Sequence, residues 1–134
     1  MHMITNPSSR DHAEVDLGPA AGVSDRGLRH HRNEDAMALA AEQAPDGPAV
    51  VAVVCDGVSS SARPDQASLV SAEAALPVLV AAVRAGDDLG AASLASVAAA
   101  RRAVADLQGP GGDTSATTFV SAPRAISSTT TQAA

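Results

Sequence analysis

The sequence predicts an α+β domain in which short strands come first, two helices follow and one further strand ends the order. Residues 50–54 form an uninterrupted run of Val and Ala, which is typical of a strand buried on both faces. From residue 64 onward, apolar residues recur every three or four positions, which indicates helices. Strands and helices do not alternate, so a βαβ arrangement is not predicted, and 134 residues fit one modest domain.

The composition limits both the core and the partners. The chain is 46% hydrophobic but only 1% aromatic, so the core must consist of Ala, Val and Leu with the single Phe119. Nine Lys and Arg against 15 Asp and Glu give a net charge of -6. Because nucleic acids and anionic membranes select basic surfaces, we expect neither as a partner.

The cysteine content and the hydropathy of the chain exclude further classes of protein. Cys55 is the only cysteine, which excludes an internal disulfide and a Cys-based zinc site. Its position in an apolar run predicts a buried packing residue. No segment approaches the length of a membrane span and the N-terminus has no secretory apolar stretch, so we expect a cytoplasmic protein.

The first half of the chain predicts strands. Residues 1–21 mix Pro, Ser, His and Asp without a period and are expected to be a mobile leader. Val23 and residues 36–40 are candidate strands around a polar connection, whose turn-forming residues are consistent with a hairpin. The turn at residues 44–48 returns the chain to residues 50–54, which predicts antiparallel pairing with residues 37–40.

The second half predicts two helices and a strand. An apolar stripe marks a helix at about 64–84, which Pro77 is expected to kink or split. A second, Ala-rich helix is expected at about 89–107, capped by Asp87 or Asp88. A strand is expected from about residue 116, and residues 123–134 are expected to be disordered.

Carboxylates stand where the predicted strand pair begins and ends. Asp56 follows residues 50–54, while Glu34 and Asp35 precede residues 36–40. Antiparallel pairing brings both groups to one end of the sheet, which predicts an all-oxygen divalent metal site. Nearby Arg29 and Arg32 could grip a phosphate. The alternatives are that Asp-Gly is an ordinary strand exit and that the polar connection is a solvated hairpin.

Two motifs in order carry a family resemblance. Ser24-Asp25-Arg26-Gly27 with Asn33-Glu34-Asp35-Ala36, and Val53-Val54-Cys55-Asp56-Gly57-Val58, resemble the opening motifs of the metal-dependent protein phosphatases, the protein phosphatase 2C (PPM) family. Ser115-Ala116-Thr117-Thr118-Phe119-Val120 resembles that family's next strand. The resemblance covers residues 22–122, as the N-terminal part of a PPM-type domain.

The resemblance implies a sandwich of two antiparallel sheets flanked by helices, with two Mn²⁺ or Mg²⁺ ions at one end. Asp56 would bridge the ions and position the attacking water, and the Gly57 carbonyl, Glu34 and Asp35 would hold one ion. That water would hydrolyse phosphoserine or phosphothreonine in a protein substrate. In the family an arginine usually grips the phosphate five positions before Asp35, where this chain has His30, so Arg29, His30 and Arg32 are the candidate phosphate-binding residues.

The resemblance also implies an incomplete site. The family's later aspartates complete its metal site, and no Asp follows Asp113 in this chain. We therefore expect weak metal binding, little or no turnover, and self-association through uncovered sheet and helix faces. The alternatives are a non-catalytic phosphatase-like interaction module and an ordinary small α+β domain with accidental motif matches.

Overall fold

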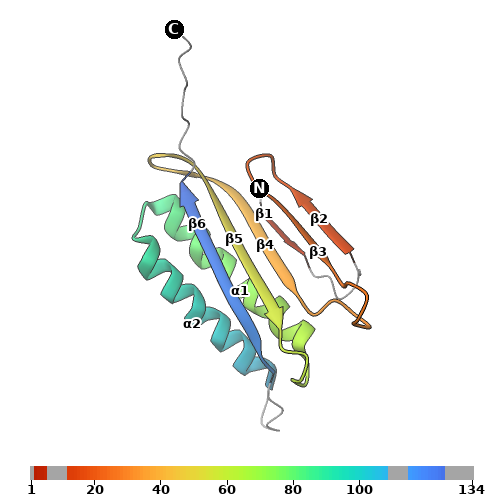
Figure 1. The fold of residues 1–134 in the computed structure, drawn as a ribbon. Coiled ribbons are helices and arrows are strands. Elements are labelled where there is room, and N and C mark those ends of the chain that lie inside the picture. Colours follow the sequence, from red (N-terminus) through yellow and green to blue (C-terminus); the bar gives the residue numbers. More distant parts are fainter. Residues whose placement is uncertain (1, 6–11, 109–114, 126–134) are drawn as a thin grey trace.

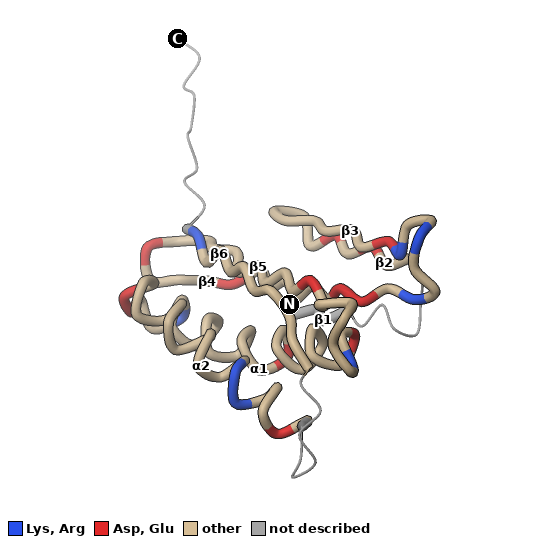
Figure 2. The backbone as a smooth tube through the Cα atoms, turned by 60° about the horizontal axis from the view of Figure 1, so that its bottom comes forward, with Lys and Arg blue, Asp and Glu red and all other residues tan. Residues whose placement is uncertain are grey.

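The computed structural model describes residues 2–5, 12–108 and 115–125 (Figure 1). A four-stranded antiparallel sheet has the strand order β1-β4-β5-β6, and a separate antiparallel pair consists of β2 and β3. Two helices lie on one face of the larger sheet and the β2–β3 pair lies on the other, as Figure 2 shows edge-on. The elements are β1 (His2–Thr5), β2 (His12–Asp16), β3 (Ala21–Asp25), β4 (Ala36–Ala44), β5 (Gly47–Gly57), α1 (Pro64–Ala85), α2 (Leu89–Gln108) and β6 (Thr117–Ala125). The α+β prediction is confirmed.

The β4–β5 hairpin is the centre of the sheet. Its register runs from Ala36 opposite Cys55 to Ala44 opposite Gly47, which confirms the pairing expected from the sequence. Gly47 has a φ of 128°, a backbone conformation that side chains other than hydrogen disfavour, so the glycine suits this tight connection. The position of every residue at the far end of the two strands follows from this register.

Both helices match their predicted ranges to within one residue. Gly86 ends α1 with a φ of 72°, and the Asp88 carboxylate accepts a hydrogen bond from the Ala91 N–H at 2.7 Å, which caps α2. Of the two outcomes expected at Pro77, a kink or a split, the split is wrong, because α1 runs through this residue as one helix. Pro77 lies on the exposed side of α1, where water can satisfy the carbonyl that lacks its helical donor.

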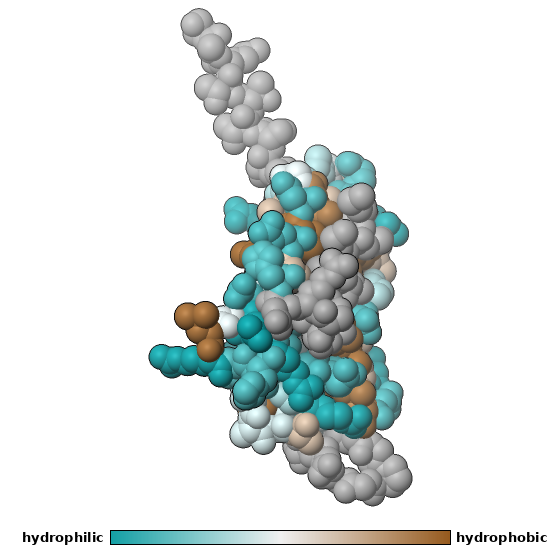
Figure 3. Space-filling model, turned by 90° about the vertical axis from the view of Figure 1, so that its right-hand side faces the viewer, coloured by the Kyte–Doolittle hydropathy of each residue, from teal (hydrophilic) through white to brown (hydrophobic). Residues whose placement is uncertain are grey.

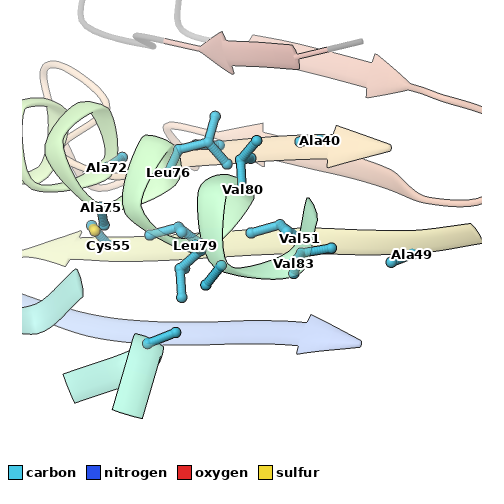
Figure 4. Close-up of a cluster of buried hydrophobic side chains, with 14 of the residues drawn as sticks. Ala40, Ala49, Val51, Cys55, Ala72, Ala75, Leu76, Leu79, Val80 and Val83 are labelled. Carbon is cyan, nitrogen blue, oxygen red and sulfur yellow. The ribbon is translucent and has the colours of Figure 1, made fainter. Parts of the chain in front are cut away.

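The core lies between the helices and one face of the sheet (Figure 4). Ala49, Val51, Val53 and Cys55 alternate along β5 toward α1, and Leu79 of α1 is fully buried against them. Burial raises the pKa of the Cys55 thiol to about 12, so this cysteine is a packing residue, as predicted. Small side chains on both layers allow a close approach of helix and sheet.

The outer face of β5 is only partly covered. Val54 keeps 52% of its surface exposed, and Val120 on the neighbouring β6 keeps 65%. The prediction that residues 50–54 are buried on both faces is therefore wrong. The β2–β3 pair lies over β4 instead, where Val15 packs against Met37 and Leu39.

The N-terminal segment also differs from its prediction. Strands at His2–Thr5 and His12–Asp16 occupy part of the expected leader 1–21. The expected hairpin between Val23 and residues 36–40 does not form, since β3 pairs with β2 while β4 pairs with β1 and β5. Burial of Val15 on the outer face of β4 explains why the pair stacks on the sheet and does not extend it.

The hydropathy of α1 and the C-terminal end of β6 also differ from what the sequence predicted. Helix α1 is long and apolar enough to span a membrane by composition, contrary to the expectation that no segment is; 56% of that stretch is buried in the fold, and core helices pass the same test. At the C-terminal end, β6 continues to Ala125, inside the predicted tail 123–134. Residues 126–134 lie outside the described residues.

Replacing Leu79 by Ala is expected to lower the free energy of unfolding by about 3 kcal/mol, because it leaves a cavity that alanine neighbours cannot fill. Urea unfolding followed by circular dichroism measures this change. Leu94→Ala is the matched control, because Leu94 on α2 is 75% exposed and its truncation should change stability little. Equal effects of the two substitutions would contradict the core described above.

Candidate functional site

Two carboxyl groups meet at the end of the β4–β5 hairpin. Ala36, the first residue of β4, lies opposite Cys55, so Asp35 just before β4 and Asp56 near the end of β5 are neighbours. Burial and the neighbouring Asp56 charge raise the pKa of the Asp35 carboxyl, which also shares a hydrogen bond with the Asp56 side chain. A hydrogen bond from the Gly57 N–H acts in the opposite direction and lowers that pKa. Because like charges repel, two neighbouring carboxyl groups favour a shared proton or a bound cation.

Glu34 does not join this pair. Asp35 is in the lining of the cavity on the outer face of β4 and β5, whereas Glu34 is not. The Glu34 carboxylate accepts a hydrogen bond from the Ser59 hydroxyl. Within residues 2–5, 12–108 and 115–125, no three His, Cys, Asp or Glu side chains form a group suited to a metal ion. Of the three predicted acidic ligands, the structure brings together Asp35 and Asp56.

Asn33 holds the segment that carries Asp35. Its side chain is buried, with 2% of the residue exposed. The amide nitrogen donates to Ser24 Oγ at 2.8 Å, and the amide oxygen accepts from the Asp35 N–H at 3.1 Å. Asn33 therefore joins the end of β3 to the start of β4. Sequence reasoning placed Asn33 in a motif but assigned it no role.

Hydroxyl groups hold the backbone of both acidic segments. The buried Ser68 hydroxyl contacts the Glu34 carbonyl oxygen and the Pro64 carbonyl oxygen, the latter at 2.8 Å. Thr117 Oγ1 donates to the Asp56 carbonyl oxygen at 2.9 Å. Helix α1 and strand β6 thus both support the carboxyl pair. The sequence carries no signal for Ser68, since a serine in the first turns of a helix is ordinary.

Gly57 is required by close packing within the protein. A Cβ atom at this position would lie 2.5 Å from the Glu34 carbonyl oxygen and 2.7 Å from the Pro64 carbonyl oxygen. Both atoms belong to the backbone and cannot rotate away. The glycine therefore lets the end of β5 approach the start of α1, whether or not its carbonyl binds an ion.

The predicted phosphate-binding residues have different surroundings. Arg32 Nη1 lies 3.2 Å from the buried Asp65 carboxylate in the first turn of α1, so Arg32 has an internal ion-pair partner. Arg29 and His30 are exposed, and no hydrogen bond or ion pair joins either to a described residue. Figure 3 shows the face of the molecule on the side of the β2–β3 pair, which is largely hydrophilic. Arg29 and His30 are therefore available to an external anion.

A cavity adjoins the carboxyl pair. It measures about 290 Å³ and lies between β3 and the outer face of β4 and β5, with Ser24, Asp25 and Asp35 in its lining. The Asp25 carboxylate accepts from the Gly27 N–H at 2.6 Å and contacts His12 Nδ1 at 3.0 Å. These two contacts, the Gly27 bond first, lower the pKa of Asp25. The cavity lining thus contains two acidic residues with different neighbours: Asp25 bonds to Gly27 and His12, whereas Asp35 adjoins the carboxyl group of Asp56.

Gly57→Ala is expected to lower the free energy of unfolding by about 2 kcal/mol or more, because the added methyl group meets two fixed carbonyl oxygens. Thermal or urea unfolding measures the loss. The matched control is Gly90→Ala in the first turn of α2, where the nearest atom to the new methyl group is 3.4 Å away. A Gly57 variant as stable as the Gly90 variant would refute the close approach.

Asp56→Asn is expected to lower the pKa of Asp35, because the neighbouring negative charge is removed. In the wild type, folding raises the pKa of Asp35 above its ordinary value of 3.8, so ionisation of this carboxyl opposes folding. The free energy of unfolding should therefore fall as the pH rises from 3.8 through the pKa of the folded state. At neutral pH the variant should gain up to about 1 kcal/mol, since solvent screens a half-exposed pair. Carboxyl NMR titration and urea unfolding measure both changes, with Glu73→Gln on α1 as a charge-matched control.

No family model, curated protein or solved structure matches this chain. The assignment of a function therefore depends on the geometry described above and on the motifs quoted from the sequence.

Proposed function

We propose that Asp35 and Asp56 bind a divalent cation, Mn²⁺ or Mg²⁺, and that the chain is the N-terminal part of a PPM-type protein serine/threonine phosphatase domain. The observation that supports this proposal best is the contact between the two carboxyl groups, with the raised pKa of Asp35. Such a pair is stabilised when a cation replaces the shared proton.

The donor set fits a hard cation but is small. Two carboxyl groups supply the oxygen ligands that Mn²⁺ and Mg²⁺ prefer, and the Gly57 carbonyl is a third candidate ligand at the same strand end. The Glu34 side chain is engaged by Ser59. Because these groups leave most of an octahedral ion to water, we expect weak binding and little or no turnover by this chain.

The surrounding residues prepare the site for a phosphorylated substrate. When bound, the cation would neutralise phosphoryl charge and activate water. Asn33 and Ser68 fix the backbone next to the carboxylates, which limits the entropy that binding must remove. Arg29, which pairs with none of the described residues, is better placed than Arg32 to pair with a phosphoserine or phosphothreonine phosphate, because Asp65 already holds Arg32.

A non-catalytic interaction module is the second candidate. The outer face of β5 and β6 exposes Val54 and Val120, and apolar groups on an open sheet face favour association. This function requires no cation at the acidic pair, and the two candidates therefore differ in a measurable property.

We expect Mn²⁺ added to the full 134-residue chain to broaden the amide NMR signals nearest Asp35 and Asp56, and to bind measurably in isothermal titration calorimetry. Asp35→Asn and Asp56→Asn should each weaken binding by about tenfold or more, since each removes one of two charged ligands. Glu73→Gln removes one charge on the exposed side of α1 and should leave binding unchanged.

Hydrolysis of p-nitrophenyl phosphate and of a phosphothreonine peptide in Mn²⁺ tests the chemistry. Slow hydrolysis that depends on Asp56 would support the phosphatase proposal. Absence of Mn²⁺ binding, together with a concentration-dependent dimer in sedimentation, would favour the interaction module. Mn²⁺ binding that is insensitive to Asp35 and Asp56 would contradict the proposed site.

A further inference from the structure

A second cavity lies on the helix side of the sheet. It measures about 460 Å³, and α1, α2 and the β6 segment all contribute to its wall. Its lining includes Ser71, Val97, Arg101, Val104, Ser115 and Phe119. Asp35 and Asp56 lie on the opposite, outer face of the sheet, so this cavity is separate from the carboxyl pair and plays no part in the function proposed above.

Ser71 brings an unpaired hydroxyl group to this cavity. The residue is 1% exposed, and its Oγ has no hydrogen-bond partner among the residues that the structure describes. Serines inside helices usually donate to the carbonyl one turn earlier, as Ser68 does to Pro64 in the same helix. A buried hydroxyl without a partner costs free energy, and a ligand oxygen in the cavity would remove that cost.

Arg101 supplies the charge. No ion pair or hydrogen bond joins its guanidinium to another described residue, although it lines the cavity. The rest of the lining is mainly apolar and includes Val97, Val104 and Phe119. The cavity therefore combines a cation, a buried hydroxyl and an apolar surface, the usual combination in sites for small organic anions.

We propose that this cavity binds a small amphipathic monocarboxylate that carries a second polar oxygen. The carboxylate pairs with the Arg101 guanidinium, which offers a planar fork of donors. The second oxygen forms a hydrogen bond with the Ser71 hydroxyl, which reaches the cavity by rotation about χ1, because its Oγ is closed to solvent in the rotamer of this structure. The apolar body of the ligand contacts Val97, Val104 and Phe119.

NMR titration of the full chain with 4-hydroxybenzoate tests this proposal, with benzoate as the probe that lacks the second oxygen. We expect saturable shifts of amides around the cavity and a Kd on the order of millimolar for so small a ligand. Benzoate should bind several-fold more weakly to the wild type. Ser71→Ala should remove this difference between the two probes. The variant should fold normally, because no described residue bonds to this hydroxyl.

Arg101→Gln should weaken binding of both probes by about tenfold, because it removes the charge that pairs with the carboxylate. Arg102→Gln is the matched control: Arg102 is the next residue on α2 and does not line this cavity, so binding should not change. Three results would each overturn the proposal: no saturable shifts up to about 20 mM, equal losses for the two arginine variants, or equal affinity of the wild type for the two probes.

Discussion

The register between β4 and β5 is the constraint on which the rest of the structure depends. Pairing of Ala36 with Cys55 brings Asp35 and Asp56 together and, through strand alternation, decides which side chains face the helices. A shift by one residue would move the Ala and Val core to the outer face and would separate the two carboxyl groups. The same pairing thus determines both the stability of the domain and its candidate chemistry.

Small residues make the acidic end of the hairpin compact. Alanine predominates where α1 meets the sheet, so the helix backbone lies close to the strands, and Gly57 leaves no space for a side chain near Glu34 and Pro64. At this short distance the Ser68 hydroxyl reaches the Glu34 carbonyl, and the backbone next to Asp35 is held without a large side chain. Close backbone packing here replaces the aromatic residues that the sequence almost entirely lacks.

The two faces of the sheet have different chemical properties. The helix face is filled by the core and contains the cavity with Ser71 and Arg101. The outer face is covered over β4 by the β2–β3 pair, carries the carboxyl pair at one end and exposes Val54 and Val120. A charged end beside exposed apolar surface suits a site that meets another molecule, and this property is common to both candidate functions.

The sequence by itself determined the helices, the β4–β5 pairing and the meeting of Asp35 with Asp56, because local periodicity and a short turn encode these features. Only the tertiary structure decided that β2 and β3 stack on β4, that the Glu34 carboxylate bonds to Ser59, and that Asp65 holds Arg32. Those outcomes depend on contacts between residues distant in the chain, such as Val15 with Met37, and on which side of a strand each residue faces. A short window of sequence contains neither kind of information, because the residue type Val does not reveal whether its side chain is buried or exposed.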